Sequence, residues 1–245
     1  MQRKDDLNMN KDVLSKRLQF IADEVQEGAV LADIGTDHGY LPVYLCSQGK
    51  IKKAIAGDVN EGPLEAAKNQ IETSHCGGFV IPRLGSGLSV IKKEDNIDTI
   101  VIAGMGGSLI SAILEEGKEK LPGVKRLILQ PNIHALYVRE WLLKEGWEIK
   151  NEHILEEDNR IYEIIVAECG EWEKPYQDIN KEAALLLGPF LLKERNDAFI
   201  KKWSRELNNW RRVLRELEKA SDENRITARK EEVERKIKLT EEVLS

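Results

Sequence analysis

The chain has 245 residues, of which 41% are hydrophobic and 33% charged, and a formal net charge of −6. This composition is typical of a globular protein with a sizeable core, and the acidic balance excludes a protein that is basic throughout. No apolar run approaches the roughly 20 residues that span a bilayer, and the opening MQRKDD lacks the apolar core of a secretion signal. We therefore expect a cytoplasmic protein without a membrane segment.

Cysteine and histidine content argues against a metal site. Cys46, Cys76 and Cys169 are scattered without a CxxC pair, and the four histidines form no ligand pattern with them. An odd number of unclustered cysteines is typical of reduced thiols that pack in a core. We expect neither a bound metal nor a disulfide framework.

In chain order, apolar side chains at helical spacing predict a first helix over 11–27, capped by Asn10 or Asp12 and ended by Gly28. Strands are expected at 30–34, 51–58, 79–82, 97–103 and 126–130, and helices at 41–48, 62–73, from 107 to 116, and at 134–145. Strands that alternate with helices predict a doubly wound, mostly parallel, Rossmann-like α/β sheet.

The pattern changes after residue 145. Two strand-like runs, 147–155 and 161–168, flank an acidic polar turn, which predicts a β-hairpin and therefore one terminal strand antiparallel to the others. Residues 171–176 are interpreted as a linker. We accordingly expect a cofactor-binding catalytic domain over 1–170 and a helical domain over 171–245.

The helical domain begins with an apolar helical patch at 185–192, interrupted by Gly188 and Pro189. Beyond it lies a heptad seam, in which apolar residues recur at spacings of 4, 3, 4 and 3. Its members are Trp203, Leu207, Trp210, Leu214 and Leu217. A turn at 221–224 precedes a weaker seam formed by Ile226, Val233, Ile237 and Leu244, with Lys230 and Thr240 in its gaps. These seams predict an antiparallel coiled-coil hairpin, or pairing with a second copy, so the protein is expected to be a monomer or a homodimer.

An acid and two glycines follow the first strand. Asp33 ends the strand, and Gly35 and Gly39 allow a ligand to approach the backbone at the carboxyl edge of the sheet. The spacing is not the GxGxxG fingerprint that binds pyrophosphate, whereas S-adenosylmethionine lacks phosphate and carries an ammonium group that a carboxylate can receive. The predicted cofactor contacts are Asp33, Gly35, Thr36, His38 and Gly39. An ordinary turn with a solvated Asp is the alternative.

A second acid, Asp58, ends the next strand. A carboxylate there can accept both hydroxyls of an adenosine ribose, in methyltransferases as in NAD enzymes. The alternative is that the segments at 58–60 and 85–87 are an ordinary turn and an ordinary loop. Its predicted cofactor contacts are Asp58, Val59 and Asn60, with Gly85, Ser86 and Gly87 near the adenine.

The segments after the fourth and fifth strands form the expected catalytic rim. Three glycines follow Ala103 and expose backbone amides and carbonyls, and no acidic or Asn-Pro-Pro-aromatic motif of exocyclic-amine methyltransferases is present. Ala103 and Gly104 are expected to contact the cofactor. The predicted catalytic residues are Gly104, Met105, Gly106, Gly107, Gln130 and Asn132. Structural turns are the alternative for Gln130 and Asn132.

Several segments together resemble the bacterial TrmK family, the tRNA (adenine-22-N1)-methyltransferases. The segments are LADIGTDHGYLP (31–42), AGDVNEGP (56–63), DTIVIAGMGG (98–107), LQPN (129–132), LSKRL (14–18) and NRIYE (159–163). Ser86 departs from the Asp or Asn that the family often has at its position. The resemblance implies a class I methyltransferase domain with a helical C-terminal domain, S-adenosylmethionine as cofactor and tRNA as substrate.

The residues are compatible with a mechanism governed by positioning. Methyl transfer from a sulfonium is an in-line displacement, and adenine N1 has an in-plane lone pair that needs no strong base. The target base must be unpaired or flipped out. Our hypothesis is that residues 104–107, Gln130 and Asn132 hold the adenine, and that Asp33 or Asp158 favours the positively charged product.

The C-terminal helices are basic enough to contact tRNA. Residues 181–245 carry 16 Lys and Arg against 13 Asp and Glu, a net of +3, whereas residues 1–180 carry −9. The candidate phosphate contacts are Arg205, Arg211, Arg212, Arg215, Arg225, Arg229 and Lys230. Solvated flanks of a coiled coil are the alternative.

Other functions remain open at this stage. One is a methyltransferase acting on another RNA, a protein or a small molecule. Another is a non-catalytic regulator that binds an adenosine cofactor and docks partners through its coiled coil. A nicotinamide oxidoreductase ranks last because the glycine spacing is wrong.

Overall fold

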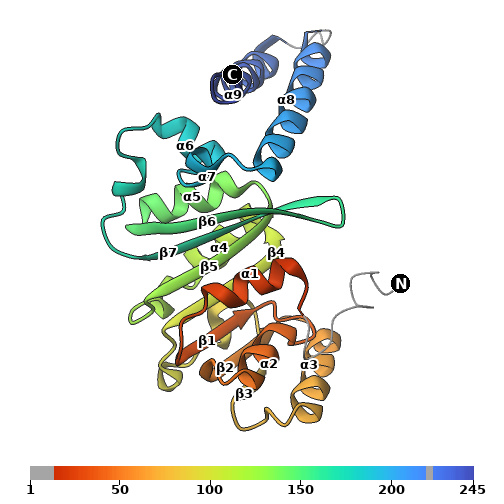
Figure 1. The fold of residues 1–245 in the computed structure, drawn as a ribbon, viewed down its shortest axis with the longest axis vertical. Coiled ribbons are helices and arrows are strands. Elements are labelled where there is room, and N and C mark those ends of the chain that lie inside the picture. The colour runs from red at the N-terminus through yellow and green to blue at the C-terminus, as the bar shows by residue number, and fades with distance from the viewer. Residues whose placement is uncertain (1–13, 219–222) are drawn as a thin grey trace.

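The computed structural model describes residues 14–218 and 223–245, and it contains a seven-stranded sheet with helices on both faces (Figure 1). The strands are β1 (Ala29–Ile34), β2 (Ile51–Asp58), β3 (Val80–Leu84), β4 (Thr99–Gly106), β5 (Arg126–Ile133), β6 (Trp147–Glu157) and β7 (Arg160–Cys169). The helices are α1 (Lys16–Glu24), α2 (Tyr40–Ser47), α3 (Glu61–Thr73), α4 (Gly107–Glu116), α5 (Ala135–Lys144), α6 (Lys181–Leu187), α7 (Leu191–Glu194), α8 (Asp197–Leu217) and α9 (Glu223–Leu244). Short 3-10 turns are η2 (Gly87–Val90), η3 (Lys93–Asp95), η4 (Lys118–Lys120) and η5 (Lys174–Tyr176).

The strand order is β3-β2-β1-β4-β5-β7-β6. β1 pairs in parallel with both β2 and β4, and the parallel pairing continues to β3 on one side and β5 on the other. β7 runs antiparallel to β5 and β6, as the predicted terminal hairpin requires. The chain therefore changes direction across the sheet between β1 and β4, and such a switch point opens a crevice at the carboxyl ends of the strands.

Two apolar cores cover the two faces of the sheet. On one face α4 and α5 pack Ile110 and Val138 against the strands. On the other face α1 and α2 pack Ile21 and Leu45 against them. Because both faces are covered, the central strands are continuous apolar runs rather than alternating ones, which is why the sequence predicts them well.

The predicted end of the fourth strand at residue 103 is wrong. β4 continues through Gly106, and α4 begins at the next residue, Gly107. β5 likewise continues to Ile133, beyond the predicted end at 130, because Met105 pairs with Pro131 and Gly106 with Ile133 after a register shift in β4. A bulge of this kind lets the ladder continue past an irregular segment, which the local sequence does not reveal.

The first helix is shorter than predicted. α1 is capped by Ser15, whose Oγ accepts a hydrogen bond from the Leu18 amide at 3.2 Å, rather than by Asn10 or Asp12, which lie outside the described residues. Its C-cap is Val25, in an extended conformation, so Gly28 does not end the helix.

The first segments after β7 pack against the sheet domain. Tyr176, in the predicted linker, is buried in the core beneath α5. The apolar patch at 185–192 forms two helices, α6 and α7, because Gly188 adopts a φ of +98° between them. Beyond them, α8 and α9 form a helical hairpin that extends from the β6–β7 end of the sheet (Figure 1).

More residues of the first predicted seam, on α8, are buried than of the second, on α9. Trp203 and Leu207 are buried on α8, and Val233 is buried on α9. Thr240 is also fully buried, although its hydroxyl makes no hydrogen bond within the described residues. The side chain of Ile226 and residues 221–222 of the predicted turn lie outside the described part, whereas residues 223–224 already belong to α9.

A buried ionic network joins α5, the β6–β7 hairpin and the C-terminal helices. Arg139 on α5 donates from Nε to Glu152 at 2.7 Å and from Nη2 to Glu163 at 2.5 Å, and all three side chains are buried. Burial alone would lower the pKa of Arg139, but the two carboxylates outweigh it and raise that pKa. Lys202 of α8 pairs with Glu163, and the amide of Phe190 donates to Glu152 at 2.9 Å.

We predict that Arg139→Met lowers the free energy of unfolding by about 3–5 kcal/mol, because it leaves two buried carboxylates without their cation. Urea denaturation followed by circular dichroism measures the loss. Arg229→Met is the matched control, since it removes an exposed pair with Glu232 and is expected to cost less than about 1 kcal/mol. Equal losses in the two variants would contradict the structural role of the network.

Candidate active site

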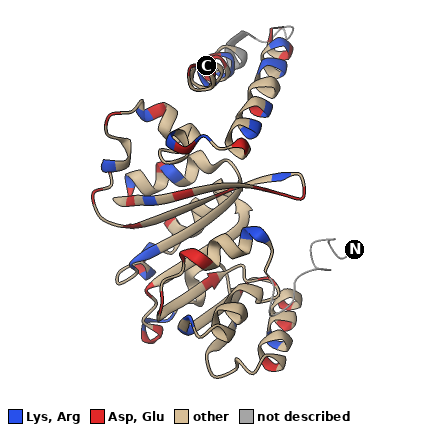
Figure 2. Ribbon diagram, in the orientation of Figure 1, with Lys and Arg blue, Asp and Glu red and all other residues tan. Residues whose placement is uncertain are grey.

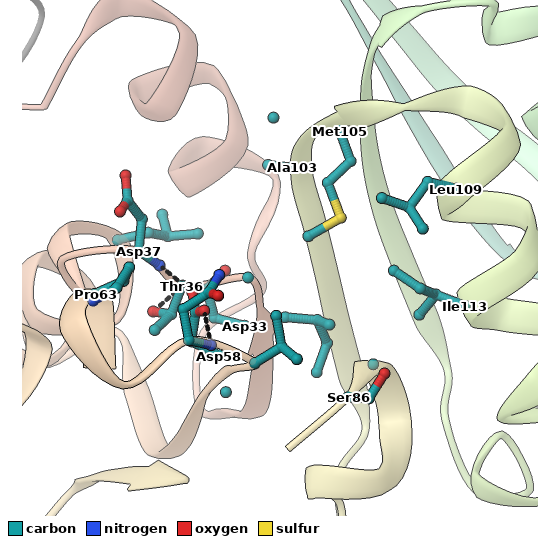
Figure 3. A pocket seen from close by; sticks show the side chains of 18 of the residues that line it. Asp33, Thr36, Asp37, Asp58, Pro63, Ser86, Ala103, Met105, Leu109 and Ile113 are labelled. Atoms are coloured by element: carbon teal, nitrogen blue, oxygen red, sulfur yellow. Dashed lines mark hydrogen bonds between the residues drawn. The ribbon is translucent and has the colours of Figure 1, made fainter. Parts of the chain in front are cut away.

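A cavity of about 780 Å³ opens at the carboxyl ends of β1, β2 and β4, at the switch point of the sheet (Figure 3). This volume lies within the range of small-molecule sites, about 300–1,000 Å³. Thirteen of the predicted site residues line it: Asp33, Gly35, Thr36, His38, Asp58, Val59, Asn60, Gly85, Ser86, Gly87, Ala103, Gly104 and Met105. The structure thus brings together segments that are separated by up to about 70 residues in the chain.

One wall of the cavity is acidic. Asp33 is buried at the end of β1, and its Oδ2 accepts a hydrogen bond from the Thr36 hydroxyl at 2.6 Å. Asp58 is buried at the end of β2 and accepts the backbone amides of Asn60 at 2.8 Å and Asp37 at 3.2 Å. These contacts orient both carboxylates at the strand ends, and Figure 3 shows them close together on one side of the cavity.

The charge of Asp33 is costly in this wall. Burial raises the pKa of the Asp33 carboxyl to about 6, the nearby carboxylates of Asp58 and Asp37 raise it further, and the hydrogen bond from Thr36 opposes them. A cation bound beside Asp33 would offset that cost. The wall is therefore suited to a positively charged ligand group.

The opposite wall is apolar. Met105 at the end of β4 and Leu109 and Ile113 on α4 direct their side chains toward the acidic wall (Figure 3). A Cβ added at Gly35 would lie 2.2 Å from the Met105 Cε, so the absence of a side chain at Gly35 leaves room for Met105. This wall can bury a flat, largely apolar group.

The backbone of Gly104 is held by two side chains from β5. Its amide donates to Gln130 Oε1 at 3.0 Å, and its carbonyl accepts from Asn132 Nδ2 at 2.7 Å. Gln130 Nε2 donates to Asn132 Oδ1 at 3.0 Å, which closes the ring of contacts. Arg17 of α1 donates to the same Gln130 oxygen at 2.7 Å. Gly104 therefore keeps a φ of +78°, which is strained for other residues, at the edge of the cavity.

Five predicted site residues do not line the cavity. Gly39 is the N-cap residue of α2, and a Cβ there would lie 3.2 Å from Ala67 of α3, so close packing accounts for this glycine. A Cβ at Gly107 would lie 2.1 Å from the His134 carbonyl oxygen, which gives this glycine a packing role too. The other three are Gly106, Gln130 and Asn132.

The fully buried Gln130 uses its amide on protein groups, whereas Asn132 is exposed. Asp158 lies exposed at the tip of the β6–β7 hairpin with a φ of +49° and is not part of the cavity lining. The structure therefore does not support its suggested role beside the reacting base.

Sequence reasoning missed lining residues from four helices, including Tyr40 and Leu41 of α2 and Pro63 of α3. Arg17 and Leu18 come from α1, whose segment LSKRL carried part of the family resemblance but was not assigned to the site. On α4 the missed residues are Leu109, Ala112, Ile113 and Glu116. Their spacing of 3, 1 and 3 places them on one helical face. That spacing, directly after the strand that ends at the cavity, could have predicted that this face lines the site.

The donor set fits an organic cation better than a metal. Within residues 14–218 and 223–245, no group of three His, Cys, Asp or Glu side chains is placed to hold a metal ion. The acidic wall can receive an ammonium or sulfonium charge, Asp58 can accept ribose hydroxyls, and the apolar wall can cover a purine. These features match the parts of S-adenosylmethionine.

Comparison with known proteins agrees with this geometry. The sequence profile of TrmK, described as tRNA (adenine(22)-N(1))-methyltransferase, matches residues 31–242. The tRNA (adenine(22)-N(1))-methyltransferase of Bacillus subtilis (strain 168) is 47% identical over 236 residues, which cover 96% of this chain and 99% of that protein.

Solved structures have the same fold over nearly the whole chain. The crystal structure of the B. subtilis m1A22 tRNA methyltransferase TrmK matches with a TM-score of 0.91, covering 95% of this chain and 99% of that one at 47% identity. Streptococcus pneumoniae Sp1610, solved in complex with S-adenosyl-L-methionine, matches with a TM-score of 0.83 at 40% identity and covers 95% of this chain and 100% of its own. The chain therefore belongs to the TrmK family of tRNA (adenine(22)-N(1))-methyltransferases.

Proposed function

We propose that this protein transfers the methyl group of S-adenosylmethionine to N1 of adenine 22 in tRNA. The observation that carries the proposal is the cavity with one acidic and one apolar wall at the switch point of a TrmK-family fold. S-adenosylmethionine supplies an electrophilic methyl group on its sulfonium. The roles of individual residues follow from their positions around that cavity.

Asp33 receives the ammonium group of the cofactor, and the ionised carboxylate is the form that binds it. Asp58 accepts the ribose hydroxyls, because it lines the cavity and the Asn60 amide holds its carboxylate in place. Ser86 and Gly87, across from Ile113, flank the adenine. Turn residues Gly35, Thr36 and His38 line the methionine end.

Catalysis rests on positioning rather than on a strong base. Adenine N1 attacks with its own lone pair, so the protein needs to align the base and exclude water. Gly104 and Met105 lie where β4 enters the cavity and are placed to meet the base. Gln130 and Asn132 act as positioning residues through the Gly104 backbone, since the Gln130 amide is buried and occupied.

Contact with tRNA is assigned to one face of α8. Arg205, Arg212 and Arg215 are exposed and make no ion pair within the described residues, and Figure 2 shows basic bands along this helix. By contrast Arg211 pairs with Glu241 at 2.7 Å, and the α9 candidates Arg229 and Lys230 pair with glutamates on their own helix. The side chain of Arg225 lies outside the described part.

Each predicted domain is assigned one role. Residues 1–170 carry the cofactor site, and residues 171–245 hold the basic face. The internal packing of the α8 and α9 seams favours a monomer over a homodimer, because α9 already covers the apolar side of α8. None of the helices in the described ranges has the length and apolar character that crossing a bilayer requires. The tRNA substrate and three free cysteines support a cytoplasmic location.

Incubation with labelled S-adenosylmethionine and unmodified bacterial tRNA tests the proposed activity. Primer extension is expected to stop at position 22 in the treated tRNA, and tRNA with guanine at that position is the matched control. Label in another position, or in protein but not in tRNA, would contradict the proposal.

The acid at Asp33 predicts a pH dependence of cofactor binding. Its pKa of about 6 means that the empty site gains a proton as the pH falls through 6, so S-adenosylmethionine affinity should fall over the same interval. Asp33→Asn should bind the cofactor at least 10-fold more weakly at pH 8 and lose the pH dependence. Calorimetric titration between pH 5 and 8 measures both effects.

Asp33→Asn should also raise the melting temperature of the unliganded protein at pH 8. The pKa of Asp33 lies above its ordinary value of 3.8, so ionisation costs more in the folded state and removal of the charge relieves that cost. A variant that melts lower and also fails to bind would indicate a structural role instead.

Asn132→Ala is predicted to reduce kcat about 10- to 100-fold, because it releases the Gly104 carbonyl and loosens the place where the base is aligned. The cofactor dissociation constant should stay within about twofold. Asn69→Ala, on the exposed surface of α3, is the control and should have no effect. Loss of cofactor binding in Asn132→Ala would overturn the positioning role.

The triple variant Arg205→Gln, Arg212→Gln, Arg215→Gln should weaken tRNA binding at least 10-fold and reduce the salt dependence of binding by up to about three counterions. Filter binding at several salt concentrations measures both. A control triple at the ion-paired Arg229, Lys230 and Arg235 should change the affinity less. Equal losses of tRNA affinity in the two triple variants would contradict the assignment of tRNA contact to α8. The affinity for S-adenosylmethionine is expected to be unchanged in both variants.

A further inference from the structure

Four exposed side chains come from the end of β5 and the starts of α4 and α5, and one of them, Leu109, lines the cavity. Ile133, at the end of β5, is 60% exposed, Leu109 on α4 is 52% exposed and Tyr137 on α5 is 47% exposed. His134, between β5 and α5, is exposed as well. We call Leu109, Ile133, His134 and Tyr137 the rim patch.

The backbone holds the rim patch together. A Cβ added at Gly107 would lie 2.1 Å from the His134 carbonyl oxygen, so the start of α4 touches the start of α5. Ser111 of α4 donates its hydroxyl hydrogen to the Tyr137 carbonyl at 3.0 Å. His134 adopts a φ of +58°, and its ring meets the Tyr137 ring edge-on, with centroids 5.7 Å apart. The two rings therefore have a defined arrangement.

The rim patch continues the apolar wall of the cavity. Leu109 belongs to both, because it lines the cavity beside Met105 and is also half-exposed (Figure 3). Ile133 lies next to Gly106, whose added Cβ would be 3.8 Å from Ile133 Cγ1. Single exposed apolar side chains need no explanation, but three of them together with the His134 ring, in a group that Leu109 joins to the cavity, indicate a binding surface.

We propose that the rim patch stacks an unpaired nucleobase of the tRNA next to the target adenine. The proposal rests on the proposed function. Extrusion of one base leaves its neighbours without a stacking partner, and aromatic side chains at the site restore that contact. Tyr137 and His134 offer ring faces and edges, while Ile133 and Leu109 offer apolar area that needs no hydrogen bond.

The position of the rim patch favours a base over a protein partner. Leu109 joins the patch to the cavity, so a nucleotide next to the one that enters the cavity is within reach of the patch. Stacking is tolerant of base identity. The rim patch would therefore contribute affinity and alignment, while the arginines of α8 contact phosphates farther along the tRNA.

The test compares Tyr137→Ala and Tyr137→Phe for binding and methylation of unmodified tRNA. Tyr137→Ala should raise the tRNA Kd by about 5- to 150-fold, the range for loss of one stacked base, whereas Tyr137→Phe should stay near the parent because it keeps the ring. His134→Asn, which tolerates the same backbone conformation, should show a smaller loss. S-adenosylmethionine affinity and melting temperature should be unchanged in all three.

Phe79→Ala is the matched control, since Phe79 is 52% exposed but precedes β3, an edge strand that three strands separate from β5. It should leave tRNA binding unaltered. Parent-like binding by Tyr137→Ala would overturn the rim patch, and so would a loss in Tyr137→Phe as large as in Tyr137→Ala. Failure of the parent protein to methylate tRNA would instead overturn the proposed function, so the two failures are distinguishable.

Discussion

The buried guanidinium of Arg139 is the interaction on which the arrangement of the two halves depends. It lies where α5, the β6–β7 hairpin and the chain after Leu185 meet, and it bonds two carboxylates and two carbonyl oxygens there. Gly188 turns directly above it, since a Cβ at Gly188 would lie 2.8 Å from Arg139 Nη2. An ionic network of this kind is weak in net stabilisation but intolerant of other geometries, so it specifies how the C-terminal helices sit on the sheet.

That placement has a functional consequence. Lys202 of α8 joins the network through Glu163, so the first turns of α8 are anchored to the same hairpin that flanks β5. The basic face of α8 is therefore held in a defined relation to the cavity. A substrate that spans both needs a rigid connection, because misplacement of a reacting base by about 1 Å costs roughly 100-fold in rate.

The acidic wall of the cavity is unfavourable in the empty protein but favourable for binding a cation. Asp33 and Asp58 lie side by side at adjacent strand ends, where burial and mutual repulsion oppose ionisation of Asp33. A cationic ligand bound there is attracted to both carboxylates, and this attraction stabilises the ionised form of Asp33. The apolar wall and the rim patch supply the complementary surface for bases.

Sequence reasoning succeeded where the physical signal is local. The apolar runs of β2 and the helix at 62–73 were located to within a residue, because periodicity and a nearby Pro63 or Gly mark such elements. Asp33 and Asp58 were assigned to the candidate site because they end strands, and both line the cavity. The β4 and β5 ends were misjudged, since the bulge that extends them depends on the pairing of two strands rather than on either one.

The sequence by itself determined the fold class, the family and the acidic half of the site, because each of these is encoded in contiguous motifs. Tertiary structure alone decided which glycines line the cavity, as Gly35 does, and which lie outside it, as Gly107 does. It also turned Gln130 from an expected substrate contact into a support for Gly104. These outcomes depend on atoms that come from distant segments, and only folding brings those atoms within a few ångströms of each other.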